Sequence, residues 1–427
     1  MKHIIFPVLA LFISGVINAQ QKDLDYYLGQ AKINSPLINR SRNDNKILDL
    51  DLKQIKSIIS KPQVSLDVNI LFAPIISRDN NSNRVELVSN GANNYIGYDL
   101  ASTDGGQYQA LVNINQPLFT NSRYKNYLSK ADISRQSNEN KIALTIHEIE
   151  QIVGYEYILC LKSKIQIENN LSLIKIVEEQ LFTLNKLVEN AIYKQTDFML
   201  LQIEYQNYIA ENEALISDYK KNIYDLNLIC GINDTTKVEL KEVNFKLKSD
   251  TPLSSGFLTS YKLDSLTVIA EQKIIEQKYK PQLSLFANAG LNAVYSPSLN
   301  RLGLSTGIAI SWNIFDGNQR EIEREKSSVN LQTIEFDKKY FVTQNDISRN
   351  NIQNQICSLS QRISLSEEQI SKYDKLLNVY SKELEQGEIS VMDYKNLLRD
   401  IASKKNENLL MKMEKQLLIN SYNYWNY

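Results

Sequence analysis

The chain is poor in histidine and cysteine. Its 427 residues contain two histidines, and because His3 lies in a leader segment, His147 is the single imidazole of the remaining chain. A lone imidazole gives little basis for histidine acid–base catalysis or for a metal site built from several histidines. The cysteines, Cys160, Cys230 and Cys357, are odd in number and far apart, which fits neither a disulfide framework nor a cysteine metal motif. We therefore expect no enzyme, no catalytic residue, no cofactor and no metal site.

Charge of one sign and long apolar runs are also missing. The net charge is −1 and the Lys and Arg residues are scattered, so no basic patch marks a nucleic-acid partner. Acidic residues are plentiful at 49, but no motif pairs two carboxylates for catalysis. After the leader, no apolar stretch reaches the roughly 20 residues that a membrane-spanning helix requires. If the chain enters a membrane, it must therefore do so as strands.

The leader has the three parts of a secretory signal peptide. A charged start at Lys2 precedes an apolar run over residues 4–17, and the small residue Ala19 follows. This run is shorter than a membrane anchor, and no Cys follows Ala19 to carry a lipid. We expect residues 1–19 to be removed on export.

Two parts of the chain repeat each other. Residues 61–66, KPQVSL, return at residues 280–285 as KPQLSL, and the segment around Phe119 returns around Phe315, 196 residues later. The first motif and the second motif return after different numbers of residues. The difference arises because residues 78–106, rich in Asn, Ser, Asp and Gly, form a long polar loop that the second copy lacks. We expect two structural repeats separated by a linker: residues 20–230, then 231–260, then 261–427.

Each repeat contains two segments in which apolar and polar side chains alternate. This period of two predicts strands at about 64–76 and 107–119 and at about 282–295 and 302–315. At about 13 residues they exceed the usual strand length of about 5 or 6 and the roughly 9 to 11 residues that cross a membrane. We expect two hairpins that face lipid on one side and water on the other. The polar residues expected to line the water-filled lumen include Asp67, Asn69, Asn113, Asn288 and Ser311. The alternative is a soluble sheet with one face on a protein core.

Long helices follow each hairpin. Residues 123–190 contain no Pro and one Gly, and as a helix they would extend about 100 Å. Apolar residues recur at every seventh position from Ile146 to Val188 and form a column along one side of the helix. The positions 196 residues later are also apolar, with the single exception of Arg349. Such columns indicate helices packed side by side as in a coiled coil, with Cys160 as a buried hydrophobe. The predicted helices are 123–190 and 197–229 in the first repeat and 319–385 and 393–422 in the second.

The order of these elements resembles the TolC family of outer-membrane efflux proteins. The matching residues are Asn34-Ser35-Pro36-Leu37 near the mature start, Lys280-Pro281-Gln282 before a strand, residues 311–317 (SWNIFDG) where a strand passes into a helix, and Gly387 six residues before Asp393. The resemblance covers nearly the whole mature chain. It implies a mainly α fold with a membrane β-barrel, in which a homotrimer forms a 12-stranded barrel on an α-helical barrel.

The resemblance also implies roles at the turns between helices. Asp393 would form a carboxylate ring at a pore constriction with Gly387, while a second family aspartate is replaced here by Asn396. A ring with fewer carboxylates is expected to select cations less strongly. The alternative for Asp393 is a solvated carboxylate favoured by the helix dipole. Ala191, Asp197 and Gly387 would lie in the tip that contacts the adaptor, and because Ala191 replaces the glycine, the two tips need not be alike.

The expected function is a passive exit duct in the outer membrane that extends into the periplasm. The resemblance implies a tripartite efflux or type I secretion system, with a periplasmic adaptor (membrane fusion) protein and an inner-membrane RND or ABC transporter as partners. Outer-membrane lipid would surround the barrel. The alternative is a secreted structural or adhesive coiled-coil protein that does not enter the membrane. The sequence does not indicate the transported substrate.

Overall fold

The computed structural model describes residues 21–78, 83–86, 94–97, 105–234, 239–248, 255–294 and 299–427. The expected signal peptide at 1–19 lies outside these residues, as do much of the polar loop at 78–106 and part of the linker at 231–260. Within the described ranges, no helix combines the length and the apolar character that a membrane crossing requires.

The chain divides into two compact units that cut across the repeats. The helical unit comprises Met1–Arg40, Ile142–Phe257 and Tyr340–Tyr427, and the sheet unit comprises Ser41–Lys141 and Leu258–Lys339. Each unit therefore takes residues from both predicted repeats. This is expected where corresponding segments of two repeats pack against each other, because the shared core forms between the copies.

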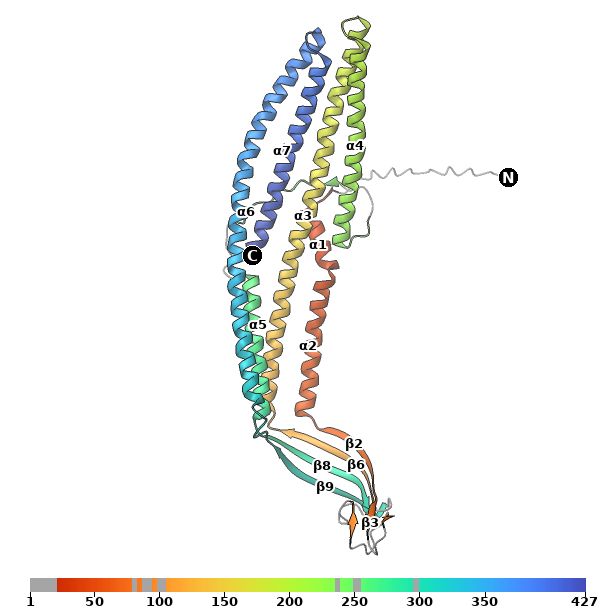
Figure 1. Cartoon of the computed structure of the whole chain (residues 1–427), viewed down its shortest axis with the longest axis vertical. Helices are drawn as coiled ribbons and strands as arrows, with labels where there is room; N and C mark the ends of the chain where they lie inside the picture. Colours follow the sequence, from red (N-terminus) through yellow and green to blue (C-terminus); the bar gives the residue numbers. More distant parts are fainter. Residues whose placement is uncertain are drawn as a thin grey trace, which may run out of the picture. The chain divides into compact units, whose positions relative to one another are not determined.

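The helical unit contains most of two long helical hairpins, whose first helices begin in the residues of the sheet unit. In the first, α3 (Asn121–Glu189) turns into α4 (Gln195–Cys230), and in the second, α6 (Gln319–Gln386) turns into α7 (Val391–Trp425). Figure 1 shows the members of each pair lying side by side near their turns. These helices begin and end within about three residues of the ranges expected from the sequence.

Shorter elements complete the helical unit. Helix α1 (Leu24–Asn34) packs against α4, and strand β1 (Gln21–Lys22) pairs in parallel with β7 (Glu239–Leu240). The expected linker at 231–260 is therefore not free of regular structure, because β7 lies within it and α5 begins before its end.

The seven-residue columns lie in the cores of the helical unit. Val153 and Cys160 are fully buried on α3, and Leu384 is fully buried on α6. Burial raises the pKa of the Cys160 thiol, which keeps it protonated and unreactive. Arg349, the exception in the second column, is half-buried and places its guanidinium over the ring of Tyr422.

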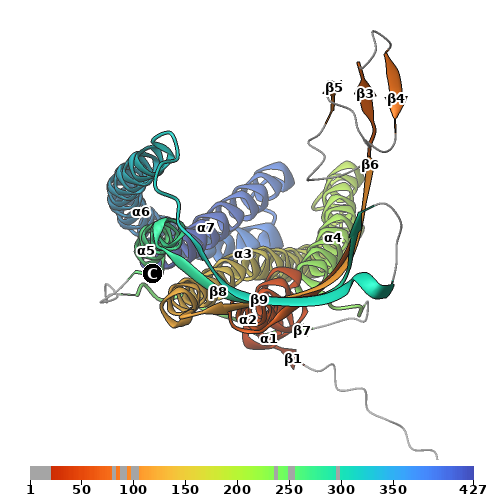
Figure 2. The ribbon, with the colours of Figure 1, turned by 90° about the horizontal axis from the view of Figure 1, so that it is seen from below.

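The sheet unit is built on one antiparallel sheet of four long strands. These are β2 (Gln63–Ala73), β6 (Gly105–Leu118), β8 (Gln282–Val294) and β9 (Leu302–Ser311), in the order β2-β6-β8-β9. The order contains the two predicted hairpins, β2 with β6 and β8 with β9, joined through β6 and β8. Figure 2 shows this sheet from below.

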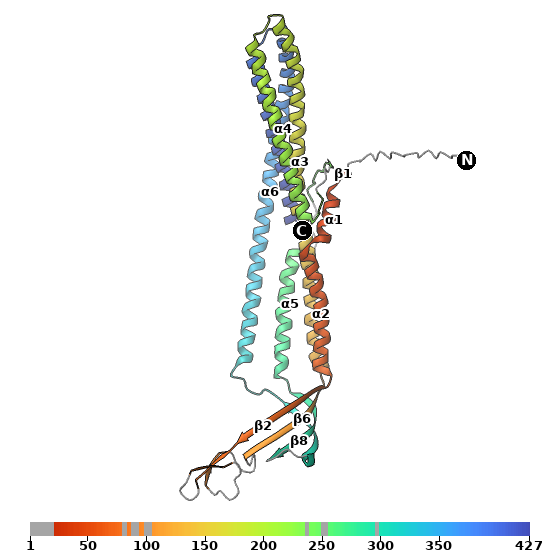
Figure 3. The same cartoon turned by 90° about the vertical axis from the view of Figure 1, so that its right-hand side faces the viewer.

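Helices and a second, small sheet accompany these strands. Helix α2 (Pro36–Ser60) leads into β2 and helix α5 (Gly256–Glu276) precedes β8, as Figure 3 shows. The short helix η2 (Gln277–Tyr279) connects α5 to β8. A 3-10 turn, η3 (Leu299–Arg301), precedes β9. The region expected to be a polar loop contains the short strands β4 (Arg84–Glu86) and β5 (Tyr95–Ile96), which pair with β3 (Ile75–Ser77), just before the loop, in the order β4-β3-β5.

Two of the long strands end earlier than expected. The strand expected at 64–76 ends at Ala73, because Pro74 has no backbone N–H to donate to the ladder. The strand expected at 302–315 ends at Ser311, which pairs with Gln282, the first residue of β8. Beyond Ser311, the neighbouring strand offers no further residue for pairing.

Candidate functional site

The five polar residues predicted to line a lumen share one face of the long sheet. Asn113 on β6 lies opposite Ser65 on β2 and Asn288 on β8, and Asn69 lies opposite Gln109. Through the same antiparallel register, Asp67 and Ser311 fall on the face that carries Asn113. The amide of Asn113 donates a hydrogen bond to the Asp67 carboxylate, and Asn69 donates one to Gln109 at 3.2 Å.

The opposite face of this sheet is apolar and exposed. Val68 on β2 has 59% of its surface exposed, and Leu304 on β9 has 83%. The other large exposed apolar residues of these two edge strands on that face are Val64, Leu66, Ile70 and Phe72 on β2 and Leu302, Ile308 and Ile310 on β9. A soluble single chain rarely leaves such a continuous apolar surface uncovered.

The turns between the long helices have the same backbone in both hairpins. Ala191 has a φ of 59° and Gly387 a φ of 77°. In each turn the next residue donates its N–H five residues back: Ile192 to Leu187 at 2.9 Å, and Glu388 to Glu383 at 2.8 Å. Both are Schellman turns. The replacement of glycine by Ala191 left open whether the two tips are alike, and their backbones are, because a Schellman hydrogen-bond pattern holds Ala191 in the left-handed region.

The returning helices begin with aspartate in both hairpins. Asp393 is the third residue of α7, and its N–H donates to Ser390 Oγ at 3.1 Å while Ser390 Oγ donates to its carboxylate at 2.7 Å. Asp197 occupies the same place in α4 and accepts from the N–H of Lys194 at 3.1 Å. The Asp197 carboxylate therefore belongs to a capping box, whereas α7 is capped by Ser390 and the Asp393 carboxylate accepts from the Ser390 hydroxyl. Asp393 remains exposed, as does Asn396 one turn further on.

The two tips touch each other. The hydroxyl of Tyr193 donates to the backbone oxygen of Ile389 at 2.6 Å. A Cβ atom on Gly387 would lie 2.7 Å from Cγ2 of Ile192. The structure thus brings Ala191 and Gly387 together through their neighbours, and glycine at position 387 serves both the positive φ and the close approach.

Replacing Ala191 with glycine is expected to stabilise the first tip. Glycine adopts a positive φ without the steric cost that alanine meets, so Ala191→Gly should raise the free energy of unfolding by about 0.5–1 kcal/mol. Gly387→Ala is the matched control and should lower it by about 1–2 kcal/mol, because the new Cβ also meets Ile192. Thermal unfolding of the detergent-solubilised protein measures both changes; a loss of stability in Ala191→Gly would contradict the interpretation.

An ion pair between a buried carboxylate and an exposed arginine joins the two hairpins below the tips. Arg399 on α7 binds Glu204 on α4 through two hydrogen bonds, Nε to Oε1 at 2.9 Å and Nη2 to Oε2 at 2.7 Å. The Glu204 side chain is only 5% exposed. The sequence analysis missed this pair. The available signal was that Glu204 falls at an inward position of α4, between the buried Leu201 and Tyr208.

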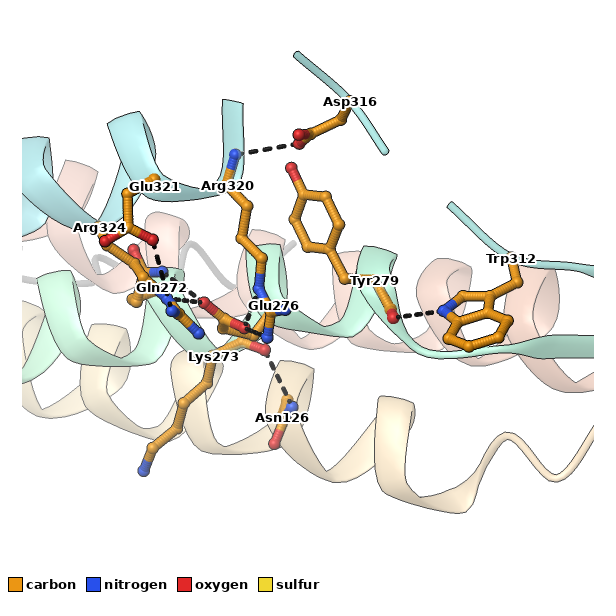
Figure 4. Close-up of polar contacts among 10 residues, drawn as sticks. All are labelled: Asn126, Gln272, Lys273, Glu276, Tyr279, Trp312, Asp316, Arg320, Glu321 and Arg324. Atoms are coloured by element: carbon orange, nitrogen blue, oxygen red, sulfur yellow. Dashed lines mark hydrogen bonds and ion pairs between the residues drawn. The ribbon is translucent and has the colours of Figure 1, made fainter. Parts of the chain in front are cut away.

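A second ion-pair cluster lies in the sheet unit, where α5 ends and α6 begins. Arg320 Nε donates to Glu276 Oε2 at 2.9 Å and Arg324 Nε donates to Oε1 at 2.7 Å. Figure 4 shows both guanidinium groups converging on this carboxylate, with the indole of Trp312 donating to the backbone oxygen of Tyr279 nearby. The contacts fix the segments that enter β8 and leave β9.

The Glu276 cluster is expected to lose its contribution to stability in acid. Hydrogen bonds from Arg324 and Arg320 lower the pKa of Glu276 from 4.5 to about 2. Because the folded pKa is depressed, the stabilisation is complete above about pH 4.5 and is lost as the pH falls toward 2. The arginines are nearly half exposed, so solvent screening limits the contribution to about 1 kcal/mol. Glu276→Gln should remove this part of the pH dependence in thermal unfolding, whereas Glu321→Gln, at a carboxylate that is 77% exposed, should retain it.

His147 is a packed side chain in the helical unit. Its ring stacks on Tyr427 with 3.9 Å between the ring centroids, and its Nε2 lies 2.9 Å from the backbone oxygen of Tyr424. The imidazole and Lys32 both contact Glu150, whose pKa falls to about 2 mainly through its hydrogen bond with His147. These contacts link α1 and α3 to the end of α7, so His147 has a structural role in the helical unit.

Solved structures with this fold are membrane channels. No known family model matches the chain, and comparison with curated protein sequences gives no match. Three similar structures are the outer membrane protein VceC of Vibrio cholerae and the outer membrane channels CmeC of Campylobacter jejuni and MtrE of Neisseria gonorrhoeae. Their TM-scores are 0.69, 0.67 and 0.66, and their identities are 13%, 12% and 12%. Each match covers 94% of this chain, and 94%, 85% and 88% of the respective neighbour. The chain therefore has the fold of these outer-membrane channels, as its resemblance to the TolC family predicted.

Proposed function

We propose that the chain is an outer-membrane channel of the TolC type, a passive exit duct from the periplasm to the outside. The observation that carries this proposal is the long sheet with one exposed apolar face and one polar face. Its strands of 10 to 14 residues are long enough to cross a bilayer. With lipid on the apolar face and water on the polar face, a solute needs only a continuous aqueous path and no catalytic group.

Closure of the sheet requires more than one copy of the chain. The edge strands β2 and β9 have no partner on their outer sides within the sheet order β2-β6-β8-β9, and unpaired backbone groups are costly in lipid. All neighbouring strands are antiparallel, so β9 of one copy can continue the same alternation with β2 of the next. A homotrimer would give a 12-stranded barrel with no edge.

The helical hairpins would form the periplasmic part of the duct. We assign the tips around Ala191, Asp197 and Gly387 to contacts with a periplasmic adaptor, which would connect the duct to an inner-membrane RND or ABC transporter. This assignment rests on the TolC resemblance and on the contact between the two tips. The proposed localisation is the outer membrane with an extension into the periplasm.

Asp393 would form the pore constriction in the trimer. Its side chain is exposed although the carboxylate accepts a hydrogen bond from Ser390, the residue that caps α7, so this contact and a role in the pore are compatible. Together with Gly387 and with Asn396 in place of a second aspartate, three copies would give one carboxylate ring. Asp393→Ala is expected to change the ion preference of reconstituted channels; an unchanged preference would reject this assignment.

Membrane extraction and reconstitution test the proposed function. The protein should remain in the membrane fraction in high salt, require detergent for release, behave as a trimer, and produce stepwise currents in planar bilayers. The alternative, a secreted coiled-coil protein, predicts release by salt alone. A purified protein that stays monomeric and never conducts would contradict the proposal.

A further inference from the structure

Charge is almost absent from the four long strands. Across Gln63–Ala73, Gly105–Leu118, Gln282–Val294 and Leu302–Ser311, Asp67 is the single residue of the types Asp, Glu, Lys and Arg. An ionised side chain on a lipid-facing strand surface is costly. The position of this one carboxylate is therefore informative about which face meets water.

Asp67 lies on the polar face. The antiparallel register pairs Asp67 with Leu111, and the residues two positions along β6, Asn113 and Gln109, flank it on the same face. The next strand continues this face with Asn288. The apolar neighbours of Asp67 in sequence, Leu66 and Val68, lie on the opposite face and are 66% and 59% exposed.

Two uncharged side chains hold the carboxylate in place. The amide of Asn113 donates a hydrogen bond to Asp67 Oδ2, and the hydroxyl of Ser65 lies 3.4 Å from the same oxygen. Neither partner carries a charge, and none of the four strands contains a Lys or Arg. The negative charge of Asp67 is therefore oriented but not neutralised by the described strands.

We infer that Asp67 is a charge-selective element of the strand region that favours cations over anions on the aqueous path. The inference rests on the proposed function, because a trimer would bring three such carboxylates to one level of the barrel. This element is separate from the tip, since Asp67 belongs to the sheet unit and Asp393 to the helical unit. A ring of fixed carboxylates attracts cations and repels anions in an aqueous pore.

Reversal potentials in planar bilayers under a KCl gradient test the inference. Asp67→Asn keeps the size of the side chain and an oxygen that accepts from Asn113, but removes the charge. It should lower the ratio of K⁺ to Cl⁻ permeability about two- to fivefold at low salt, with a smaller effect at high salt. Asn288→Asp is the matched control on the same face and should raise the ratio. Asp393→Asn in the same experiment separates the contribution of the tip.

The possible failures are distinct. If the wild-type protein and Asp67→Asn both conduct with the same permeability ratio, the role of Asp67 is contradicted while the channel function stands. If Asp67→Asn does not assemble, Asn288→Asp still tests the inference. An Asn288→Asp channel that conducts with an unchanged ratio of K⁺ to Cl⁻ permeability would contradict a charge-selective aqueous face. A wild-type protein without current contradicts the proposed function itself.

Discussion

Val68→Arg is expected to prevent assembly of the protein in the membrane, whereas Asn69→Arg is expected to be tolerated. The two residues are adjacent on β2 but point to opposite faces of the sheet, and Val68 belongs to the exposed apolar face. An arginine facing lipid at the middle of a bilayer costs about 2–4 kcal/mol, and a trimer would incur this cost three times. An arginine at position 69 would instead extend into water.

The measurement is the fraction of each variant recovered as detergent-extracted, heat-resistant oligomer from membranes. Because the two variants introduce the same side chain one residue apart, they differ in the face that receives the charge and not in composition. Equal recovery of both variants, or greater loss with Asn69→Arg, would contradict the assignment of the faces.

Arg399→Met is expected to destabilise the helical unit more than removal of any exposed ion pair. It leaves the carboxylate of Glu204, which is 5% exposed, without its charged partner. A buried acceptor left without its partner costs about 1–3 kcal/mol, and because the Arg399 side chain is 54% exposed, solvent screening keeps the cost below that of a fully buried pair. The stability of the protein in detergent, followed by helix content during thermal unfolding, measures the loss.

Two controls make the Arg399 experiment specific. Lys372→Met breaks an exposed pair with Glu368 on α6 and should leave stability almost unchanged, because solvent screens this pair. The double variant Glu204→Gln with Arg399→Met removes both charges and should recover much of the loss. If the single variant is as stable as the wild type, the pair does not join the two hairpins in solution.

The long helices and the alternating strands could be predicted from the sequence because their signals are local. Val64, Leu66 and Val68 recur every second residue, and Val153 and Cys160 are seven residues apart. Spacing of this kind indicates which side of an element is apolar before any partner is known. The register confirms that Asp67, Asn69, Asn113, Asn288 and Ser311 share one face.

Other features could not be predicted because they depend on contacts between distant segments. Alanine at position 191 left open whether the first tip is like that at Gly387, and the hydrogen bonds of the turn give both the same backbone. The early end of β9 depends on where its neighbour β8 begins. The pairing of Glu204 with Arg399 follows from the packing of α4 on α7, and neither residue alone indicates the other.

The periodicity of each element and the polar or apolar character of each of its faces can be read from the amino-acid sequence alone. Which faces meet became clear only from the folded chain: β6 lies beside β8, the two tips are in contact, and each compact unit combines segments far apart in the chain. Backbone geometry fixes the spacing of side chains along a single element, and this spacing needs no partner. Partners, in contrast, are selected by the free energy of burying particular surfaces together, which requires residues far apart in the chain.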